Sequence, residues 1–209
     1  MNHMVQKKSK PPRGRPSEYN LDEVVGRATA VFWAHGSDAT SVSALERATH
    51  LNRSTIYTAL GGKEGLFDRC LRAYVDAAES GLLAPALTGT SGIDDLVALV
   101  ERVGAMLDSS ENPPGCFAIR SLVRGEGDVH ARHYRDALRS AITASLQRAV
   151  ESDGLDPALG SSRAALVEAA LLGMLAVGRS PGHDPQTLAG GLVAQVQAWR
   201  SPSPTGSAR

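Results

Sequence analysis

Residues 51–67 of this chain read LNRSTIYTALGGKEGLF, and this stretch decides the fold. Asn52 can cap a helix over about 53–60, and the glycine pair that follows ends this helix and begins another. Upstream, residues 42–50 have the apolar spacing of a shorter helix. Two short helices joined by a tight turn, the second with exposed polar side chains, form a unit that can enter the major groove of DNA. The stretch therefore predicts a helix-turn-helix, although two short helices also occur in ordinary helical bundles.

The outward side of the second helix has the chemistry needed to read DNA. Arg53 can reach guanine edges with two hydrogen bonds, and hydroxyl groups can reach bases or phosphates. Tyr57 can reach a phosphate, and so can Lys63 beside the free amides of the next helix. Ile56 and Leu60 are expected to point inward. The residues that we expect to contact DNA in this unit are Thr40, Ser41, Asn52, Arg53, Ser54, Thr55, Tyr57, Thr58 and Lys63.

The first 17 residues, MNHMVQKKSKPPRGRPS, contain five basic residues, three prolines and no acid. This composition is typical of a disordered basic arm. The RGRP sequence resembles the core of an AT-hook, so we expect Arg13 and Arg15 to lie in an A·T minor groove. The alternative is a solubilising tail that contacts nothing.

The rest of the sequence has helical periodicity and no useful run that alternates with period two. Asn20 is expected to cap a first helix that ends at Gly36. The segment GLLAPALTGTSG, residues 81–92, predicts a break. Apolar residues at helical spacing are expected to form one face of the first helix: Leu21, Val25, Ala28 and Phe32. Later helices are expected at 93–109, 115–125, 128–152, 161–178 and 185–199. The sequence therefore predicts an all-α fold, with a three-helix DNA-binding bundle before a larger helical bundle.

Bulk composition narrows the class of protein. The formal net charge is zero, but residues 1–75 hold eleven Lys or Arg against seven Asp or Glu, and residues 76–209 hold eleven against fifteen. A basic front end suits a nucleic-acid partner. Two cysteines without CxxC spacing, and no signal peptide, favour a reducing cytoplasm over a disulfide framework or a zinc site. An apolar stretch around 164–178 is interrupted by Glu168, so we expect no membrane span, and no motif calls for a cofactor.

Residues 21–67 resemble the DNA-binding domain of the TetR/AcrR family of bacterial transcription regulators. The resemblance covers about a quarter of the chain and depends on both the order and the spacing of its residues. The matching positions are Phe32, Gly36, Thr40, Ser41, Val42, Leu45, Ala48, Ile56, Tyr57, Lys63, Glu64, Leu66 and Phe67. Three positions depart from the family pattern: His50 replaces a glycine expected in a left-handed conformation, Leu60 replaces an aromatic residue, and Gly62 replaces a capping serine.

The resemblance implies a DNA-binding domain over 18–75 and a ligand-binding and dimerisation domain over 76–200. The sequence SPSPTGSAR, residues 201–209, predicts a disordered tail. The resemblance also implies a homodimer, formed here through the Ala- and Gly-rich helices near 161–178 and 185–199. Two recognition helices would then read a palindromic operator in double-stranded DNA, and a small-molecule effector would release a repressor.

An effector cavity is implied between the C-terminal helices. We expect an aliphatic or mixed ligand, because aromatic residues make up only 4% of the chain. The candidate lining residues are apolar or aromatic side chains at helical spacing, most of which could equally be core: Met106, Cys116, Phe117, Leu122, Tyr134, Leu138 and Met174.

Other functions remain open at this stage. Cys116 begins a helix, where the helix dipole lowers the pKa of a thiol, so a redox- or electrophile-sensing regulator is one alternative. An architectural binder of A·T-rich DNA that uses the basic arm is another. His130 and His133 could begin a metal site, but no third ligand at a fitting spacing stands out, and no arrangement of catalytic residues indicates an enzyme.

Overall fold

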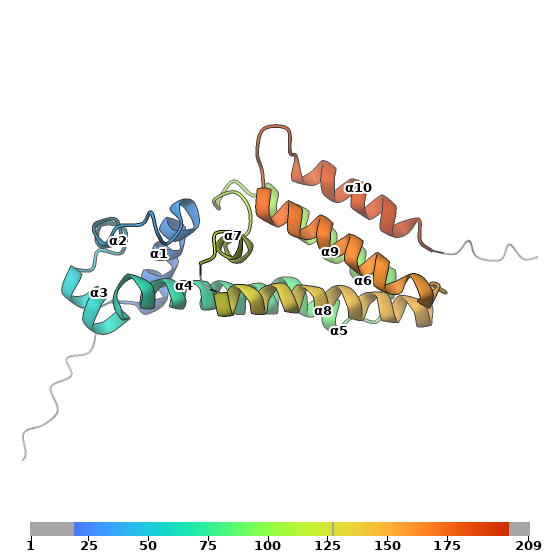
Figure 1. Cartoon of the computed structure of the whole chain (residues 1–209), viewed down its shortest axis with the longest axis horizontal. Helices are drawn as coiled ribbons and strands as arrows, with labels where there is room; N and C mark the ends of the chain where they lie inside the picture. Colours follow the sequence, from blue (N-terminus) through green and yellow to red (C-terminus); the bar gives the residue numbers. More distant parts are fainter. Residues whose placement is uncertain (1–18, 127, 201–209) are drawn as a thin grey trace, which may run out of the picture.

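The computed structural model describes residues 19–126 and 128–200, and the regular elements in these residues are all helical. The elements are α1 (Leu21–His35), α2 (Val42–Thr49), α3 (Arg53–Leu60), α4 (Gly62–Ala78), the π-helical turn η1 (Glu79–Leu83), α5 (Ala84–Thr88), α6 (Gly92–Asp108), α7 (Phe117–Val123), α8 (Asp128–Ser152), the 3-10 turn η2 (Pro157–Leu159), α9 (Gly160–Val177) and α10 (Pro185–Gln197). Helices α1–α3 gather at one end, and α4 leads from them into a bundle that contains α6, α8, α9 and α10 (Figure 1). The predicted all-α fold is confirmed for the described residues.

Helix α1 begins as predicted, because the Asn20 side chain accepts hydrogen bonds from backbone N–H groups in the first turn. Its buried face differs from the prediction. Val24 and Trp33 are buried together with Ala28 and Phe32, whereas Leu21 is 41% exposed. The core-facing stripe is therefore rotated from the predicted one, since α1 packs against α2 and α4 at the same time.

The tight turns at the ends of α2 and α3 lie close to the residues at which the sequence predicts them. His50 has φ 58°, and it is the only non-glycine residue with positive φ in the part of the chain that the structure describes. The prediction of a left-handed residue at this position is confirmed. Gly61, with φ 78°, is the N-cap of α4, so the predicted cap at Gly62 was one residue too late. A Cβ at Gly65 would overlap the carbonyl oxygen of Leu60, so this glycine permits the close approach of α3 and α4.

The predicted break over 81–92 is wrong as far as residue 88, where α5 ends. Helix α4 passes through η1 directly into α5. Leu82, Leu83 and Ala86 are buried, so burial of apolar side chains keeps this segment helical. Pro85 lies in the first turn of α5, directly after the π-helical turn. The expected boundary between residues 75 and 76 falls inside α4.

The C-terminal bundle is built around α6, which packs against α10 and α8. Apolar residues at helical spacing on α6 are buried: Ile93, Leu96, Val97, Val100, Val103 and Leu107. The helix predicted over 128–152 matches α8, and α9 and α10 lie within two residues of their predicted bounds. Asp184 caps α10 by accepting a hydrogen bond from the N–H of Thr187 at 2.9 Å, and Pro185 occupies the first turn.

Helix α9 leaves much of its apolar surface uncovered. By length and composition, residues Pro157–Val177 could cross a membrane, with a mean hydropathy of 1.3, but one such helix is weak evidence because core helices pass the same test. Only 22% of this segment is buried within the chain. Leu166 is 50% exposed and Val177 45% exposed. An apolar face of this kind is typical of a surface that meets another molecule.

Candidate nucleic-acid interface and effector cavities

Helix α3 presents a polar surface on a rigid support. Ile56 and Leu60 fix it in the N-terminal core, while Arg53, Ser54 and Tyr57 are exposed. The ring and hydroxyl of Tyr57, with 55% of its area exposed, extend away from the core. These positions match the predicted division between buried and outward residues, and their proposed contacts to DNA stay a prediction.

Some polar groups of α3 are already used within the helix. The Asn52 side chain accepts hydrogen bonds from the N–H of Thr55 at 2.8 Å and from its hydroxyl at 2.9 Å. The Thr58 hydroxyl donates to the carbonyl oxygen of Ser54 at 2.8 Å. A hydroxyl oxygen that donates in this way can still accept a hydrogen bond. Thr55 and Thr58 are therefore better placed to accept from DNA bases than to donate to them.

Thr40 and Ser41 have different positions. Ser41 is exposed and caps α2, because its hydroxyl oxygen accepts from the N–H of Ala44 at 3.1 Å. Thr40 is only 3% exposed, and its hydroxyl donates to the carbonyl oxygen of Gly36 at 2.6 Å. The sequence placed Thr40 among the DNA contacts, but in the structure its side chain is enclosed in the turn between α1 and α2.

Lys63 is half-buried rather than fully extended into solvent. Its ammonium group donates to the carbonyl oxygen of Ser37 at 3.0 Å, which ties the start of α4 to the loop after α1. Arg13 and Arg15, expected in the minor groove, lie outside the described residues.

A polar seam joins the DNA-binding unit to the C-terminal bundle. The N–H of Asp38 donates to Glu126 Oε1 at 3.3 Å, across from the loop that follows α7. His130 Nε2 on α8 lies 3.1 Å from Asp68 Oδ1 on α4. His133 Nε2 lies 2.7 Å from Glu79 Oε1. The two histidines thus pair with carboxylates, and no group of metal-ligating residues occurs in the described parts of the chain.

The buried position of Cys116 disfavours the alternative of a redox- or electrophile-sensing regulator. The residue has no exposed area, and burial raises the pKa of its thiol. The Tyr74 hydroxyl donates to its Sγ at 3.3 Å. A cysteine at the start of a helix gains reactivity only where solvent and reagents reach it, and here neighbouring helices cover it. Burial also raises the pKa of the Cys70 thiol, to about 11.

An aromatic cluster crosses the boundary between the two helical units, and the sequence analysis missed it. Phe67 and Tyr74 on α4 each meet Phe117 edge to face, with ring centroids 5.8 and 5.7 Å apart. Trp33 on α1 stacks on the same ring at 6.1 Å. The sequence did contain a signal for this cluster, because the helical period places each of these four rings on the inward face of its own helix. The cluster explains why Phe117 is a core residue that couples α1, α4 and α7.

The predicted cavity residues are mostly core residues. Cys116, Phe117, Tyr134 and Leu138 have at most 1% exposure, because α7 and α8 close together around them. Leu122 is half-buried and packs against the core. These five residues are therefore part of the core, and their contact with an effector stays a prediction.

Two of the predicted cavity residues line recesses in the described chain. Met106 lines a shallow cleft between α1, α4 and α6, and Met174 lines a groove between α9 and α10.

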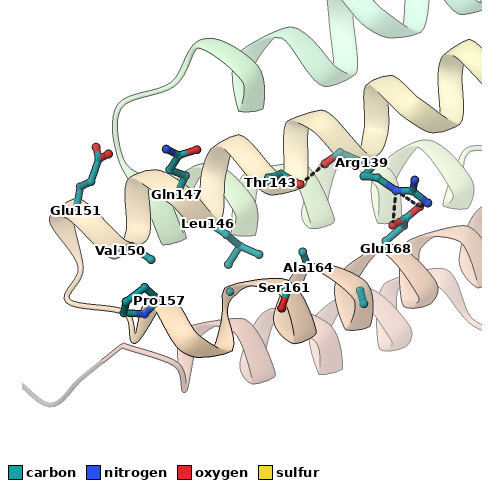
Figure 2. Close-up of a pocket in the computed structure, with 12 residues that line it drawn as sticks. Arg139, Thr143, Leu146, Gln147, Val150, Glu151, Pro157, Ser161, Ala164 and Glu168 are labelled. Carbon is teal, nitrogen blue, oxygen red and sulfur yellow. Dashed lines mark hydrogen bonds and ion pairs between the residues drawn. The ribbon is translucent and has the colours of Figure 1, made fainter.

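A larger cavity, of about 660 Å³, lies between α8 and α9 (Figure 2). Small residues of α9, among them Gly160 and Ala164, face Leu146 and Val150 of α8 across it. This site was not predicted, because the predicted cavity residues were large apolar side chains. The informative signal was the run of small residues at the start of α9.

Comparison with known proteins identifies relatives of the N-terminal unit and of the fold. Residues 25–70 match the family model described as bacterial regulatory proteins, tetR family. The HTH-type transcriptional repressor ComR of Escherichia coli K12 is 34% identical over 127 residues, which cover 57% of this chain and 59% of ComR. BdcR, a second HTH-type transcriptional repressor of the same organism, is 28% identical over 120 residues, which cover 57% of this chain and 60% of BdcR. The chain thus matches less than two thirds of the length of either relative.

The fold extends over nearly the whole chain. The TetR family transcriptional regulator CifR, solved as a cysteine mutant with 26-base-pair operator DNA, superposes with a TM-score of 0.75 at 22% identity. The superposition covers 89% of this chain and 100% of CifR. The N-terminal helix-turn-helix unit, over residues 25–70, is therefore a domain of the tetR family of bacterial regulatory proteins, and the helical fold of the chain is similar to that of CifR.

Proposed function

We propose that the chain is a dimeric, sequence-specific transcriptional repressor that an effector releases from a palindromic operator. The observation that carries this proposal is the exposed polar face of α3, formed by Arg53, Ser54 and Tyr57 on a helix whose other side is buried. A rigid helix with this surface can enter the major groove. The names of ComR, BdcR and CifR as repressors or regulators support the same role.

Individual residues would divide the work. Arg53 reads a guanine edge, and Ser54 and Thr58 contact bases or phosphates. Tyr57 donates its hydroxyl to a phosphate. Lys63 has three ammonium donors and uses one for Ser37, so it can contact a phosphate while it holds the loop. Thr40 is left out of this surface because it is buried.

The basic arm is part of the same proposal. Arg13 and Arg15 would enter the minor groove beside the operator half-site, as an arm before a helix-turn-helix can do. Each phosphate that the arm neutralises steepens the dependence of DNA affinity on salt.

A second copy of the chain would cover the exposed side of α9 and α10. Leu166, Val177 and Leu188 are 50%, 45% and 42% exposed, and Gly173 on the same side of α9 allows a helix to approach closely. An apolar groove runs between the two helices and is lined in part by Gly173 and Leu188. A symmetric pair of such faces is self-complementary, and it would bring two α3 helices to two operator half-sites.

Effector binding would act through the long helices of the C-terminal bundle. Helix α4 belongs to both units, and α8 pairs with it through His130 and Asp68. A ligand that binds better to the conformation unable to fit DNA shifts the population toward it. As a DNA-binding regulator, the chain would act in the cytoplasm.

Selection of bound sequences from random double-stranded DNA tests the proposal. The full chain should enrich a palindromic site, and gel shift with that site should give a salt-dependent complex. Enrichment of no sequence would contradict the repressor assignment. Deletion of residues 1–16 should weaken this complex, whereas an architectural binder that depends on its arm would lose it completely.

A further inference from the structure

A cleft of about 410 Å³ lies between α1, α4 and α6, where the DNA-binding unit meets the C-terminal bundle. Its lining is mostly apolar and includes Val25 of α1, Ala73 of α4 and Met106 of α6. Open space remains beside Gly26, where a Cβ would meet nothing within 4 Å. The cleft can therefore enclose small apolar groups.

Trp33 lines the base of this cleft, and its indole nitrogen lacks a hydrogen-bond partner. The residue is only 6% exposed, and its Nε1 is closed off from water without an acceptor among the described residues. Buried N–H groups are nearly always paired, so an unpaired one calls for an acceptor. Tyr74, half-buried on α4, stands edge to face against the Trp33 ring at 5.1 Å. The base of the cleft thus combines aromatic rings with an unpaired donor.

This combination suits a proline-rich segment. Such segments dock in aromatic-lined grooves, because proline rings pack on aromatic side chains and the extended chain loses little conformational entropy on binding. An extended segment of this kind has no internal hydrogen bonds, so its carbonyl oxygens are free to accept. One of these carbonyls can take the N–H of Trp33.

Two unpaired carboxylates lie beside the cleft. Asp22 lines it in the first turn of α1, and Glu111 precedes the lining residue Asn112 in the loop after α6. Both side chains are exposed, and neither forms an ion pair with another residue that the structure describes. A segment that docks here is therefore favoured if it is basic as well as proline-rich.

The basic arm has this chemistry, and it is attached at the edge of the cleft. Residues 10–16 read KPPRGRP, with three prolines and three bases. Tyr19, the first described residue, is half-buried and packs against the core. Asp22 of the lining follows it by less than one helical turn. The arm therefore leaves the described structure next to the surface that it matches.

The arm is also long enough to reach the base of the cleft. From Tyr19 to Trp33, helix α1 rises about 21 Å at 1.5 Å per residue. Seven residues of extended proline-rich chain span about 22 Å at 3.1 Å per residue. A chain that folds back along α1 from Tyr19 therefore brings Pro11 and Pro12 to Trp33.

We propose that residues 10–16 fold back into this cleft of the same chain when no DNA is bound. The prolines at 11 and 12 pack on Trp33, whose indole turns so that Nε1 donates to a carbonyl oxygen of the segment. Arg15 pairs with Asp22 at the near end of the cleft.

Docking of the arm competes with DNA. This part of the inference rests on the proposed function, in which Arg13 and Arg15 enter the minor groove. The same residues cannot occupy the cleft and the groove together, so only the undocked fraction of the chain binds DNA with the whole arm. The cleft therefore lowers the affinity for DNA and makes binding depend on release of the arm.

Hydrogen exchange at one indole tests the docking. The chain has two tryptophans, so Trp199→Phe leaves Trp33 as the source of a single indole N–H signal in nitrogen-15 NMR. Without DNA, this N–H should exchange with deuterium about tenfold or more slowly in the full chain than in a chain that lacks residues 1–16, because a hydrogen bond protects it. Equal exchange in the two chains would overturn the proposal.

Paired substitutions in the arm separate prolines from charge. In the Trp199→Phe background, joint Pro11→Ala and Pro12→Ala changes should remove the protection of the indole. Joint Lys7→Ala and Lys8→Ala changes lie beyond the segment that reaches the cleft and should keep it. Protection that survives the proline changes and disappears with the lysine changes would refute docking through the prolines.

A monomeric chain shows whose arm occupies the cleft. Leu166→Glu, which places a carboxylate in the proposed contact between two copies, should keep the protection of the Trp33 indole if each arm docks on its own chain. Loss of the protection in a folded monomer would assign the cleft to the arm of the second copy and overturn the assignment to the same chain.

Fluorescence anisotropy of a labelled operator tests the competition. Gly26→Leu fills the cleft, so it should free the arm and raise the DNA affinity about threefold. Gly81→Leu is a matched change at a glycine of η1 that also has open space around it, and it should leave the affinity unchanged. An unchanged or lower affinity of Gly26→Leu would overturn the competition. Failure of every chain to bind DNA would contradict the proposed function, while indole exchange would still report on docking.

Discussion

Helices α3 and α9 each leave one side uncovered, but the chemistry of the two uncovered sides is opposite. Helix α3 buries only Ile56 and Leu60 and exposes Arg53 and Tyr57. Helix α9 buries four of its 18 residues and exposes apolar ones, such as Leu166. A polar surface with an arginine suits DNA, and an apolar surface with small residues suits another helix. The proposed DNA contact and the proposed contact with a second copy therefore lie on separate helices. A substitution can disrupt one of them and leave the other intact.

The largest effect should come from a charge in the apolar surface of α9. Leu166→Glu should convert a dimer to a monomer at micromolar concentration, because it places an unpaired carboxylate in a buried contact. Analytical ultracentrifugation measures this change. DNA affinity should fall by about 100-fold or more, since one half-site contact is lost. Val123→Glu, at a residue 74% exposed on α7, is the control and should stay dimeric. A dimeric Leu166→Glu variant would place the interface elsewhere.

The next effect concerns sequence preference at α3. Arg53→Ala should cost about 1–3 kcal/mol at one position of the operator and relax the preference there. Tyr57→Phe, which removes one phosphate contact, should weaken binding to all sequences by a similar factor. Binding to a set of single-base operator variants separates the two patterns. An unchanged preference in Arg53→Ala would exclude this residue from base recognition.

A smaller effect is expected from Thr40, which is buried behind the DNA-binding surface. Thr40→Val keeps the shape but removes the hydrogen bond to the Gly36 carbonyl, so it should lower the free energy of unfolding by about 1–2 kcal/mol. Urea unfolding measures the loss. The salt dependence of DNA binding should stay the same, because no phosphate contact is removed. A shallower salt dependence would return Thr40 to the contact surface.

The smallest effect is expected at His50, whose φ of 58° is unfavourable for a side chain with a Cβ. His50→Gly should raise the free energy of unfolding by about 0.5 kcal/mol, because relief of this conformation exceeds the added freedom of the unfolded chain. Thermal unfolding measures the change. A clear loss of stability would indicate that the His50 side chain has a contact worth more than the backbone strain.

Helix starts were predicted correctly where they depend on a few neighbouring residues. Asn20, Asn52 and Asp184 are caps, and capping depends on a few adjacent residues, so these helix starts could be located without a structure. His50 could be recognised as left-handed for the same reason. The exposed residues of α3 could also be predicted from nearby sequence, because the helical period alone determines which positions face outward.

The missed features depend on contacts between distant segments. Cys116 begins a helix, as predicted, but its N–H bonds to the carbonyl of Leu175 on α9 and the surrounding helices enclose its thiol. The continuation of α4 through η1 depends on the burial of Leu82 and Leu83 in the C-terminal bundle. The groove between α8 and α9 depends on which faces of two helices oppose each other, and helical periodicity does not specify this.

In the proposed function, the apolar faces of α9 join two copies of the chain, and the polar faces of their α3 helices bind one DNA site together. Native mass spectrometry of the chain mixed with its selected palindromic duplex tests this directly. The account predicts that the smallest abundant complex holds one duplex and two chains, and that Leu166→Glu removes this complex. A stable complex of one duplex with a single chain, unaffected by Leu166→Glu, would contradict it.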